Sequence, residues 1–125
     1  MNENEIGDIV LSGAMKVHSA LGPGLLESAY ETCLVHEIVK RGLNVKRQAP
    51  QPVIYDGLKL DAGYKLDLLV NNCVIVELKA VEKLLPIHVA QLLSYLKLSG
   101  CSLGYLLNFN VVHMRDGIKR IVNKL

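Results

Sequence analysis

Apolar residues recur every three or four positions in two stretches near the start of the chain and in one nearer its end. This spacing predicts amphipathic helices. The first helix is predicted over residues 5–21, before a Gly-Pro-Gly break. The second is predicted over residues 25–41 and ends before Gly42, a residue type that favours helix C-termini. The third is predicted over residues 86–100, with a proline at its start and a glycine at its end.

The pattern changes to that of strands between the second and third helices. Residues 45–55 are predicted to form an edge or bulged strand, because two prolines interrupt their hydrogen-bonding capacity. A turn at Asp56-Gly57 leads to residues 58–70, where apolar and polar positions alternate. The apolar positions, expected on one face, are Leu60, Ala62, Tyr64, Leu66, Leu68 and Val70. Residues 73–81 are apolar on both faces, which predicts a central strand.

Two further strands are predicted over residues 103–108 and 111–115, followed by a short last segment over residues 118–125. The predicted order is α-α-β-β-β-α-β-β, which indicates an α/β or α+β sandwich. No repeat, low-complexity tract or linker divides the chain. We therefore interpret residues 1–125 as one domain.

Three charged residues lie where the pattern predicts a buried sheet. Glu77 and Lys79 are two positions apart on the central strand, so their side chains leave the same face. Asp67, on the preceding strand, supplies a third charge. Buried charges cost several kcal/mol unless they are paired or bind a metal. Two carboxylates beside a lysine form a hard-oxygen site that suits Mg²⁺ or Mn²⁺.

The loop between the two strands decides whether these side chains meet. A two-residue loop would place Asp67 and Glu77 on opposite faces. A three-residue loop, residues 71–73, pairs Val70 with Val74 and brings Asp67 opposite Glu77. We predict the longer loop, because asparagine tolerates the left-handed conformation that it needs. The alternative interpretation is an ordinary glutamate–lysine pair on a solvated face of the sheet.

Two predicted helices carry polar side chains that could face this site. His88, Gln91 and Tyr95 form a polar seam on the third helix. Glu27 and Tyr30 share a face of the second helix with Glu31. The alternatives are a helix flank that meets water and a first-turn acid that stabilises the helix dipole.

These residues occur within motifs that resemble the GxxExxY protein family, which is placed in the PD-(D/E)XK nuclease superfamily. The segments that carry the resemblance cover nearly the whole chain: Gly24-Leu-Leu-Glu27-Ser-Ala-Tyr30, Tyr64-Lys-Leu-Asp67-Leu-Leu-Val, Val74-Ile-Val-Glu77-Leu-Lys79-Ala, Gln91-Leu-Leu-Ser-Tyr95-Leu, Asn108-Phe109 and Gly117-Ile-Lys-Arg120-Ile-Val. The chain has Lys65-Leu66 where the family has Arg-Ala, and lysine lacks the bidentate phosphate geometry of arginine.

The resemblance implies a restriction-endonuclease-like core, with a mixed central sheet flanked by helices. It implies that Asp67 and Glu77 are metal ligands and that Lys79 is the catalytic lysine. Glu27 would be the first-helix acid. Gln91 and Tyr95 resemble the helix motif of the exonuclease branch.

We therefore expect a metal-dependent nuclease that hydrolyses phosphodiester bonds of DNA or RNA with an activated water. In this hypothesis Asp67 and Glu77 hold one or two Mg²⁺ ions, the backbone carbonyl of Leu78 completes the shell, and Lys79 orients the attacking water. One alternative is a non-catalytic nucleic-acid-binding or protein-interaction domain that retains the fold. Another is a toxin-like or regulatory subunit of a larger assembly.

Further residues are candidates for positioning and substrate contact. Glu27 and Gln91 would position water or metal from the flanking helices. Tyr30 and Tyr95 are predicted to stack on exposed bases, since the chain has no tryptophan and one phenylalanine. His18 either approaches the site or caps the first helix.

Composition says more about the folding and location of the protein than about its chemistry. Half of the residues are hydrophobic and the mean hydropathy is +0.27, which excludes disorder and makes a homodimer plausible. The net charge of +2 is too small to indicate a nucleic-acid partner by itself. No apolar run is long enough to span a membrane, and the start lacks a signal-peptide layout. The three cysteines form no CxxC pair, so we expect a cytoplasmic protein.

Overall fold

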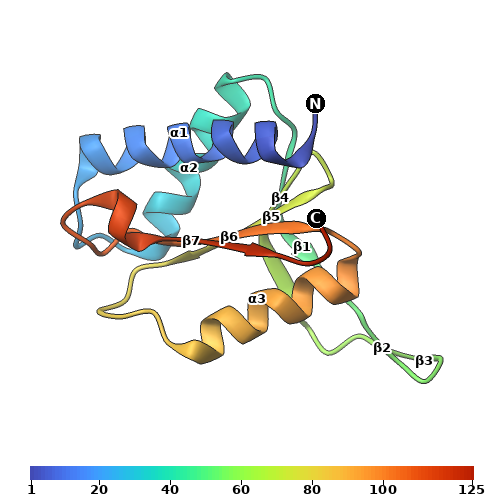
Figure 1. Ribbon diagram of the computed structural model, residues 1–125. Helices are drawn as coiled ribbons and strands as arrows, with labels where there is room; N and C mark the ends of the chain where they lie inside the picture. Colours follow the sequence, from blue (N-terminus) through green and yellow to red (C-terminus); the bar gives the residue numbers. More distant parts are fainter.

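Five strands form the central sheet of the computed structural model, which describes residues 1–125 (Figure 1). Their order in the sheet is β1–β4–β5–β6–β7. Only β5 and β6 run parallel; the other neighbours are antiparallel. The strands span Val45–Pro50 (β1), Lys65–Val70 (β4), Val74–Lys79 (β5), Leu103–Asn108 (β6) and Ile118–Val122 (β7). The α/β class and the mixed central sheet predicted from the sequence are confirmed.

Three helices cover the two faces of this sheet. Helices α1 (Glu3–Leu21) and α2 (Glu27–Lys40) lie on one face, and α3 (Pro86–Ser99) lies on the other (Figure 1). Each face has its own apolar core, the larger one under α1 and α2. None of the three helices combines the length with the apolar character needed to cross a membrane.

The loop before β5 has the length that the sequence predicts. Val70 pairs with Val74, so residues 71–73 form a three-residue turn. Asn71 and Asn72 adopt φ angles of 49° and 57°, in the left-handed region that asparagine tolerates. Strand β5 is the middle strand of five, and its residues 74–78 are all buried. The predictions of a central strand and of its register are both confirmed.

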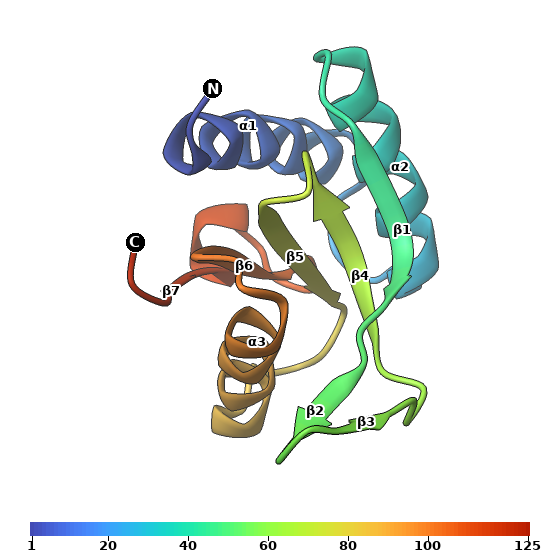
Figure 2. The same cartoon turned by 90° about the vertical axis from the view of Figure 1, so that its right-hand side faces the viewer.

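The predictions of one long strand on each side of Asp56-Gly57 are wrong. Residues 45–55 divide into β1 and β2 (Val53–Tyr55), and residues 58–70 divide into β3 (Leu58–Leu60) and β4. Strands β2 and β3 pair only with each other, in a hairpin that projects from the sheet (Figure 2). The chain leaves the sheet at Pro52, which has no N–H to donate, and rejoins it after Gly63, whose φ is 83°.

The predicted strand over residues 111–115 is absent. A 3₁₀ helix, η1 (Met114–Gly117), lies there instead, and only residues 118–122 return to the sheet as β7. The cause is the side chain of Asn108, whose Oδ1 accepts hydrogen bonds from the backbone N–H groups of Val81 and Asn110. These bonds hold the chain in a turn at the end of β6, so residues 111–115 do not run alongside a strand of the sheet.

The turn into β7 depends on a glycine. A Cβ atom at Gly117 would lie 2.0 Å from the carbonyl oxygen of Asn108, which is fixed backbone. We predict that Gly117→Ala lowers the free energy of unfolding by about 2–4 kcal/mol, because overpacking against the backbone forces the chain to move. Urea denaturation followed by circular dichroism measures this. The exposed neighbour variant Asp116→Ala is the control, with an expected change within about 0.5 kcal/mol; equal losses in the two variants would contradict the packing argument.

Candidate active site

The sheet ladder is broken on both sides of Asp67 in β4. On one side, β1 and β4 pair at every position from Val45 to Pro50 except that of Gln48, which faces Asp67 in this register. Gln48 has a φ of 49°, so its backbone is turned out of the ladder. On the other side, regular pairing between β4 and β5 ends at Leu68 and Val76. Asp67 and Glu77 would be the next pair.

The two carboxylates replace the missing ladder bonds. The backbone N–H of Asp67 donates to Oε2 of Glu77 at 2.7 Å, and the backbone N–H of Leu78 donates to Oδ2 of Asp67 at 2.9 Å. Each side chain therefore bridges the gap to the opposite strand. The backbone occupies one oxygen of each carboxylate, and the side-chain amide of Gln48 also approaches Asp67 and lowers the pKa of its carboxyl. The structure thus brings Asp67 and Glu77 together, as the predicted register requires.

The break also changes the face to which β4 points its apolar side chains. Leu68 and Val70 pack in the core under α1 and α2, whereas Leu66 packs in the core under α3. Tyr64 and the apolar residues before it are exposed. The prediction that all of these residues share one face is therefore wrong, because the strand turns at Asp67 and its regular alternation does not extend through the turn.

Burial makes both carboxylates hard to ionise, and the charge of Asp67 adds to this effect at Glu77. Glu77 is only 5 % exposed, and desolvation together with the nearby charge of Asp67 raises its pKa to about 8. Desolvation also raises the pKa of Asp67, although the hydrogen bond from Leu78 opposes the change. The charge of Lys79 lowers both values but does not cancel the burial. Lys79 takes part in none of the three ion pairs of the chain.

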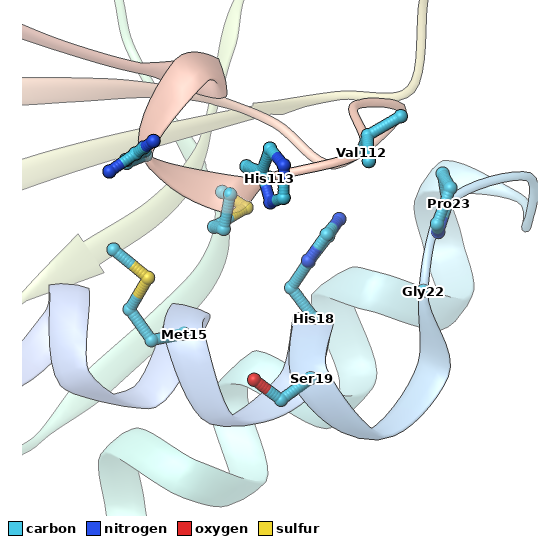
Figure 3. Close-up of a pocket in the computed structure, with 9 residues that line it drawn as sticks. Met15, His18, Ser19, Gly22, Pro23, Val112 and His113 are labelled. Carbon is cyan, nitrogen blue, oxygen red and sulfur yellow. The ribbon is translucent and has the colours of Figure 1, made fainter.

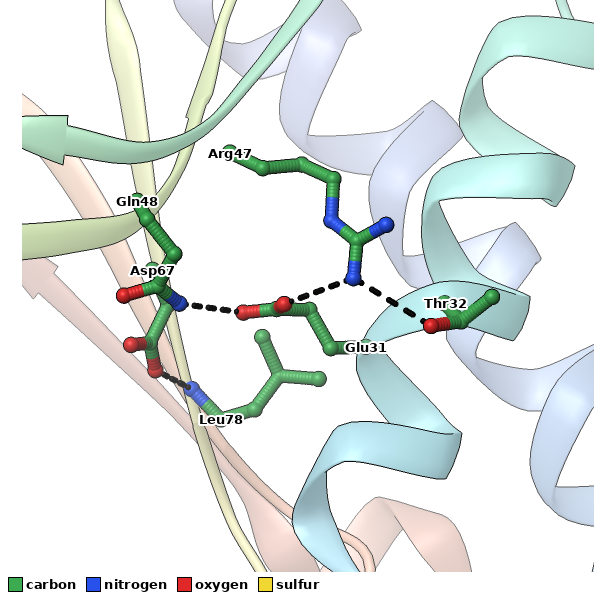
Figure 4. Close-up of polar contacts among 6 residues, drawn as sticks. All are labelled: Glu31, Thr32, Arg47, Gln48, Asp67 and Leu78. Atoms are coloured by element: carbon green, nitrogen blue, oxygen red, sulfur yellow. Dashed lines mark hydrogen bonds and ion pairs between the residues drawn. The ribbon is translucent and has the colours of Figure 1, made fainter.

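Helix α2 contributes acidic residues to the same region. Glu27, its first residue, has a raised pKa because of desolvation and the charge of Asp67. One turn later, Glu31 is buried and accepts hydrogen bonds from Arg47 and Gln48 of β1 (Figure 4). The guanidinium of Arg47 forms an ion pair with Glu31 and balances its charge. Glu27, by contrast, is exposed to solvent.

Helix α3 approaches the site from the other face. Burial and the charges of Glu77 and Asp67 raise the pKa of Tyr95, so its ring lies within their electrostatic reach. Tyr95 packs edge-on against Tyr64 at a centroid distance of 6.2 Å. Gln91 is exposed one turn away and lines a groove together with these two tyrosines.

Asn108 is a buried polar residue, and the sequence did not reveal its structural role. It is 2 % exposed, and its amide exchanges two hydrogen bonds with the backbone of Val81, at 2.9 and 3.1 Å. The next residue, Phe109, donates its backbone N–H to the carbonyl of Lys79 at 2.9 Å. Asn108 and Phe109 therefore fix the backbone directly after Lys79. The sequence signal was an asparagine at the end of an otherwise apolar strand.

One of the predicted substrate contacts is not available for stacking. Tyr30 is fully buried: its ring stacks on Phe109 at 4.7 Å, and its hydroxyl donates to the carbonyl of Gly22 at 2.6 Å and accepts the N–H of Leu25. These two hydrogen bonds fix the loop before α2. Tyr95 is also buried, at 6 % exposure. The prediction that Tyr30 stacks on exposed bases is wrong, because its ring is covered, whereas Tyr95 lines the groove beside Gln91 and its stacking stays a prediction.

His18 does not cap the end of α1 with its ring. The ring is 8 % exposed, and its Nε2 lies 2.7 Å from the carbonyl oxygen of Val111, in the loop after β6. His18 therefore ties α1 to this loop and faces a cavity beside it.

The donor set fits a divalent cation of the Mg²⁺ type. No three His, Cys, Asp or Glu side chains are arranged to hold a metal ion, so Glu27 does not complete a three-carboxylate cluster. Mg²⁺ is commonly held by one or two carboxylates and takes its other ligands from water and substrate phosphate. Asp67 and Glu77, each with one oxygen that accepts no backbone N–H, meet that requirement.

Comparison with known proteins gives one match. The model of a family described as the PD-(D/E)XK nuclease superfamily matches residues 4–121, a range that contains every residue of the candidate site. No curated protein and no solved structure matches the chain.

The raised pKa of Glu77 has a consequence for stability. A carboxyl that is protonated more readily when folded contributes stability in full below its ordinary pKa of 4.5 and loses that contribution as the pH rises through about 8. In metal-free buffer we therefore predict that Glu77→Gln is more stable than the wild type by roughly 1–3 kcal/mol at pH 8, since a tenfold change in proton affinity is worth about 1.4 kcal/mol.

Chemical denaturation with EDTA at pH 5 and pH 8 measures this difference. At pH 5 the advantage of Glu77→Gln should largely vanish. The exposed Glu82→Gln variant is the control and should follow the wild type at both pH values. A Glu77→Gln advantage that is the same at both pH values would contradict the prediction.

Proposed function

Because this chain belongs to the PD-(D/E)XK nuclease superfamily, we propose that it hydrolyses phosphodiester bonds of DNA or RNA with the help of Mg²⁺ or Mn²⁺. One observation carries the proposal: two carboxylates converge in a break of the central sheet, beside a lysine with no ion-pair partner. Such an arrangement is costly for the fold, and a bound cation would remove most of the cost.

Asp67 and Glu77 are the residues that would hold the cation, through the oxygens that the backbone leaves free. In an extended strand the N–H and C=O of one residue point to the same side. The N–H of Leu78 points at Asp67. The carbonyl of Leu78 therefore faces the same gap and would be the third protein oxygen available to the cation. A cation bound here would supply Lewis acidity and stabilise the charge that develops on the phosphate.

Lys79 has the central part among the groups of the chain itself. Its Nζ hydrogen-bonds the attacking water, orients the water towards phosphorus and offsets negative charge on the phosphate. The water oxygen forms a bond to phosphorus and loses a proton to solvent, while the bond from phosphorus to a sugar oxygen breaks and that oxygen takes a proton from solvent. One phosphate end and one hydroxyl end remain. Asn108 and Phe109 keep the Lys79 backbone in place for this step.

The flanking helices would complete the site. We propose that Glu27 positions water from α2, where the raised pKa of its carboxyl reflects the nearby Asp67. Gln91 would do the same from α3, at the entrance to the groove beside Tyr95. Within the superfamily, the Gly24-Leu-Leu-Glu27-Ser-Ala-Tyr30 motif supports placement in the GxxExxY family.

A non-catalytic nucleic-acid-binding or protein-interaction domain is the second candidate, and one observation favours it. Both carboxylates accept backbone N–H groups and so connect β4 to β5 without any ion. A purely structural role would need no more than this. Metal binding and cleavage therefore have to be measured separately.

The nuclease proposal predicts a specific pattern of activity. Asp67→Asn, Glu77→Gln and Lys79→Met should each lower the rate of oligonucleotide cleavage in Mg²⁺ or Mn²⁺ by about 10²–10⁴-fold, because each removes charge stabilisation from the transition state. The amide variants keep an oxygen that can accept the backbone N–H groups, so the strands stay connected. Cleavage of labelled single- and double-stranded DNA and RNA, read on denaturing gels, measures the rates.

Lys83→Met is the matched control, since Lys83 is an exposed lysine in the loop after β5. It should cleave at the wild-type rate. Equal activity in all five proteins would mean that the cleavage comes from a contaminant or from another site, and the proposal would then fall.

Metal binding provides an independent prediction. Mn²⁺ at about one hundred times its Kd should stabilise the wild type by about 2.7 kcal/mol and raise Tm by several degrees. Asp67→Asn should lose most of this shift, while Lys83→Met should retain it. Calorimetric titration of metal-free protein gives Kd directly. No Mn²⁺ binding, or binding unchanged in Asp67→Asn, would favour the non-catalytic domain.

Homodimer formation stays a prediction. The β2–β3 hairpin exposes several large apolar side chains, which a second copy could cover: Ile54, Tyr55, Leu58 and Leu60. Light scattering of the purified protein gives the mass that decides between monomer and dimer.

A further inference from the structure

A cavity of about 670 Å³ lies between α1 and the loop that follows β6. Figure 3 shows Met15 and His18 rising from the helix and Val112 and His113 facing them from the loop, with Pro23 at one end. The volume is within the range of small-molecule sites in proteins. This cavity takes no part in the chemistry described above.

The polar lining of the cavity is entirely cationic or neutral. His18, His113 and Arg115 line it together with Ser19, and none of its nine lining residues is acidic. Arg115 is exposed and belongs to none of the three ion pairs of the chain. Its charge is therefore available to a ligand. A cavity with this lining favours a ligand that carries negative charge.

The rest of the lining is apolar. Met15 is 40 % exposed and Val112 is 79 % exposed, so both side chains are accessible to a ligand. A lining that combines one arginine and two histidines with apolar side chains matches a nucleotide, whose phosphate is anionic and whose base presents a flat apolar face. A free phosphate would make no use of the apolar side chains.

The cavity is close along the chain to the candidate active site. Gly22 lines the cavity, and Glu27 lies beside Asp67 and Lys79. Five residues extend by at most about 18 Å, so the two sites are within reach of one short strand of nucleic acid. The hydroxyl of Tyr30 fixes the intervening loop through Gly22 and Leu25.

We propose that this cavity binds a nucleotide of the nucleic-acid strand that is cleaved at Asp67 and Glu77, so the inference rests on the proposed function. Arg115 and His113 contact the phosphate, and Met15 and Val112 contact the base. The ionic contact places the strand, and the apolar contact tolerates any base.

Binding without cleavage tests the proposal. Fluorescence anisotropy in EDTA measures Kd for a labelled single-stranded oligonucleotide, with 5′-phosphorylated and 5′-hydroxyl forms compared. The double variant His113→Ala/Arg115→Ala should weaken binding by about 5–20-fold and reduce the slope of log Kd against log salt by about one. Met15→Ala/Val112→Ala should weaken binding without changing that slope. Weakening confined to the 5′-phosphorylated form assigns the cavity to the strand end, and weakening of both forms assigns it to an internal phosphate.

Lys59→Ala is the matched control, because it also removes one positive charge but lies on the distant hairpin. An equal loss of affinity in Lys59→Ala would overturn the proposal, since the effect would then be one of overall charge. Cleavage measured alongside separates the two hypotheses. Cleavage with Kd unchanged in the double variant overturns the cavity and leaves the nuclease. Weakened binding without any cleavage in Mn²⁺ supports the cavity and counts against the nuclease.

Discussion

The structure depends on two carboxylates that occupy a break in the middle of the sheet. Asp67 and Glu77 stand where β4 and β5 would otherwise continue their ladder, and each accepts a backbone N–H from the opposite strand. Burial raises the pKa of both, and the charge of Asp67 raises the pKa of Glu77 further. The sheet is therefore held together at this point by groups that repel each other when ionised, and the neighbouring elements are arranged to tolerate that strain.

Most of that tolerance comes from side chains that bond to backbone and do not touch the carboxylates. Asn108 closes the chain after Lys79, and Tyr30 anchors the loop that leads to Glu27. Arg47 forms an ion pair with Glu31, whose charge still raises the pKa of Asp67. The acidic pair, Lys79 and the exposed Glu27 form no ion pair in this region.

The sequence predicts this arrangement as far as local rules reach. Helical spacing finds all three helices, and the loop at Asn71 and Asn72 sets the register that brings Asp67 to Glu77. The prediction fails where long-range contacts replace a local pattern. Alternation over residues 58–70 continues through Asp67, but the strand turns there; residues 111–115 are apolar enough for a strand, but Asn108 turns them away. Tyr30 looked like a surface residue because helical spacing does not reveal that Phe109 covers it.

The chemistry of the two acids argues for a cation more strongly than their positions do. If their only task were to join β4 to β5, asparagine and glutamine would accept the same N–H groups without the desolvation penalty of a charge. The chain has carboxylates instead, and Glu77 lies in a strand with five buried residues and has a pKa of about 8. Nothing within the chain removes that penalty, because Lys79 forms no ion pair with either acid. A divalent cation between them would remove it, and the same ion would bring the chemistry that phosphodiester hydrolysis needs.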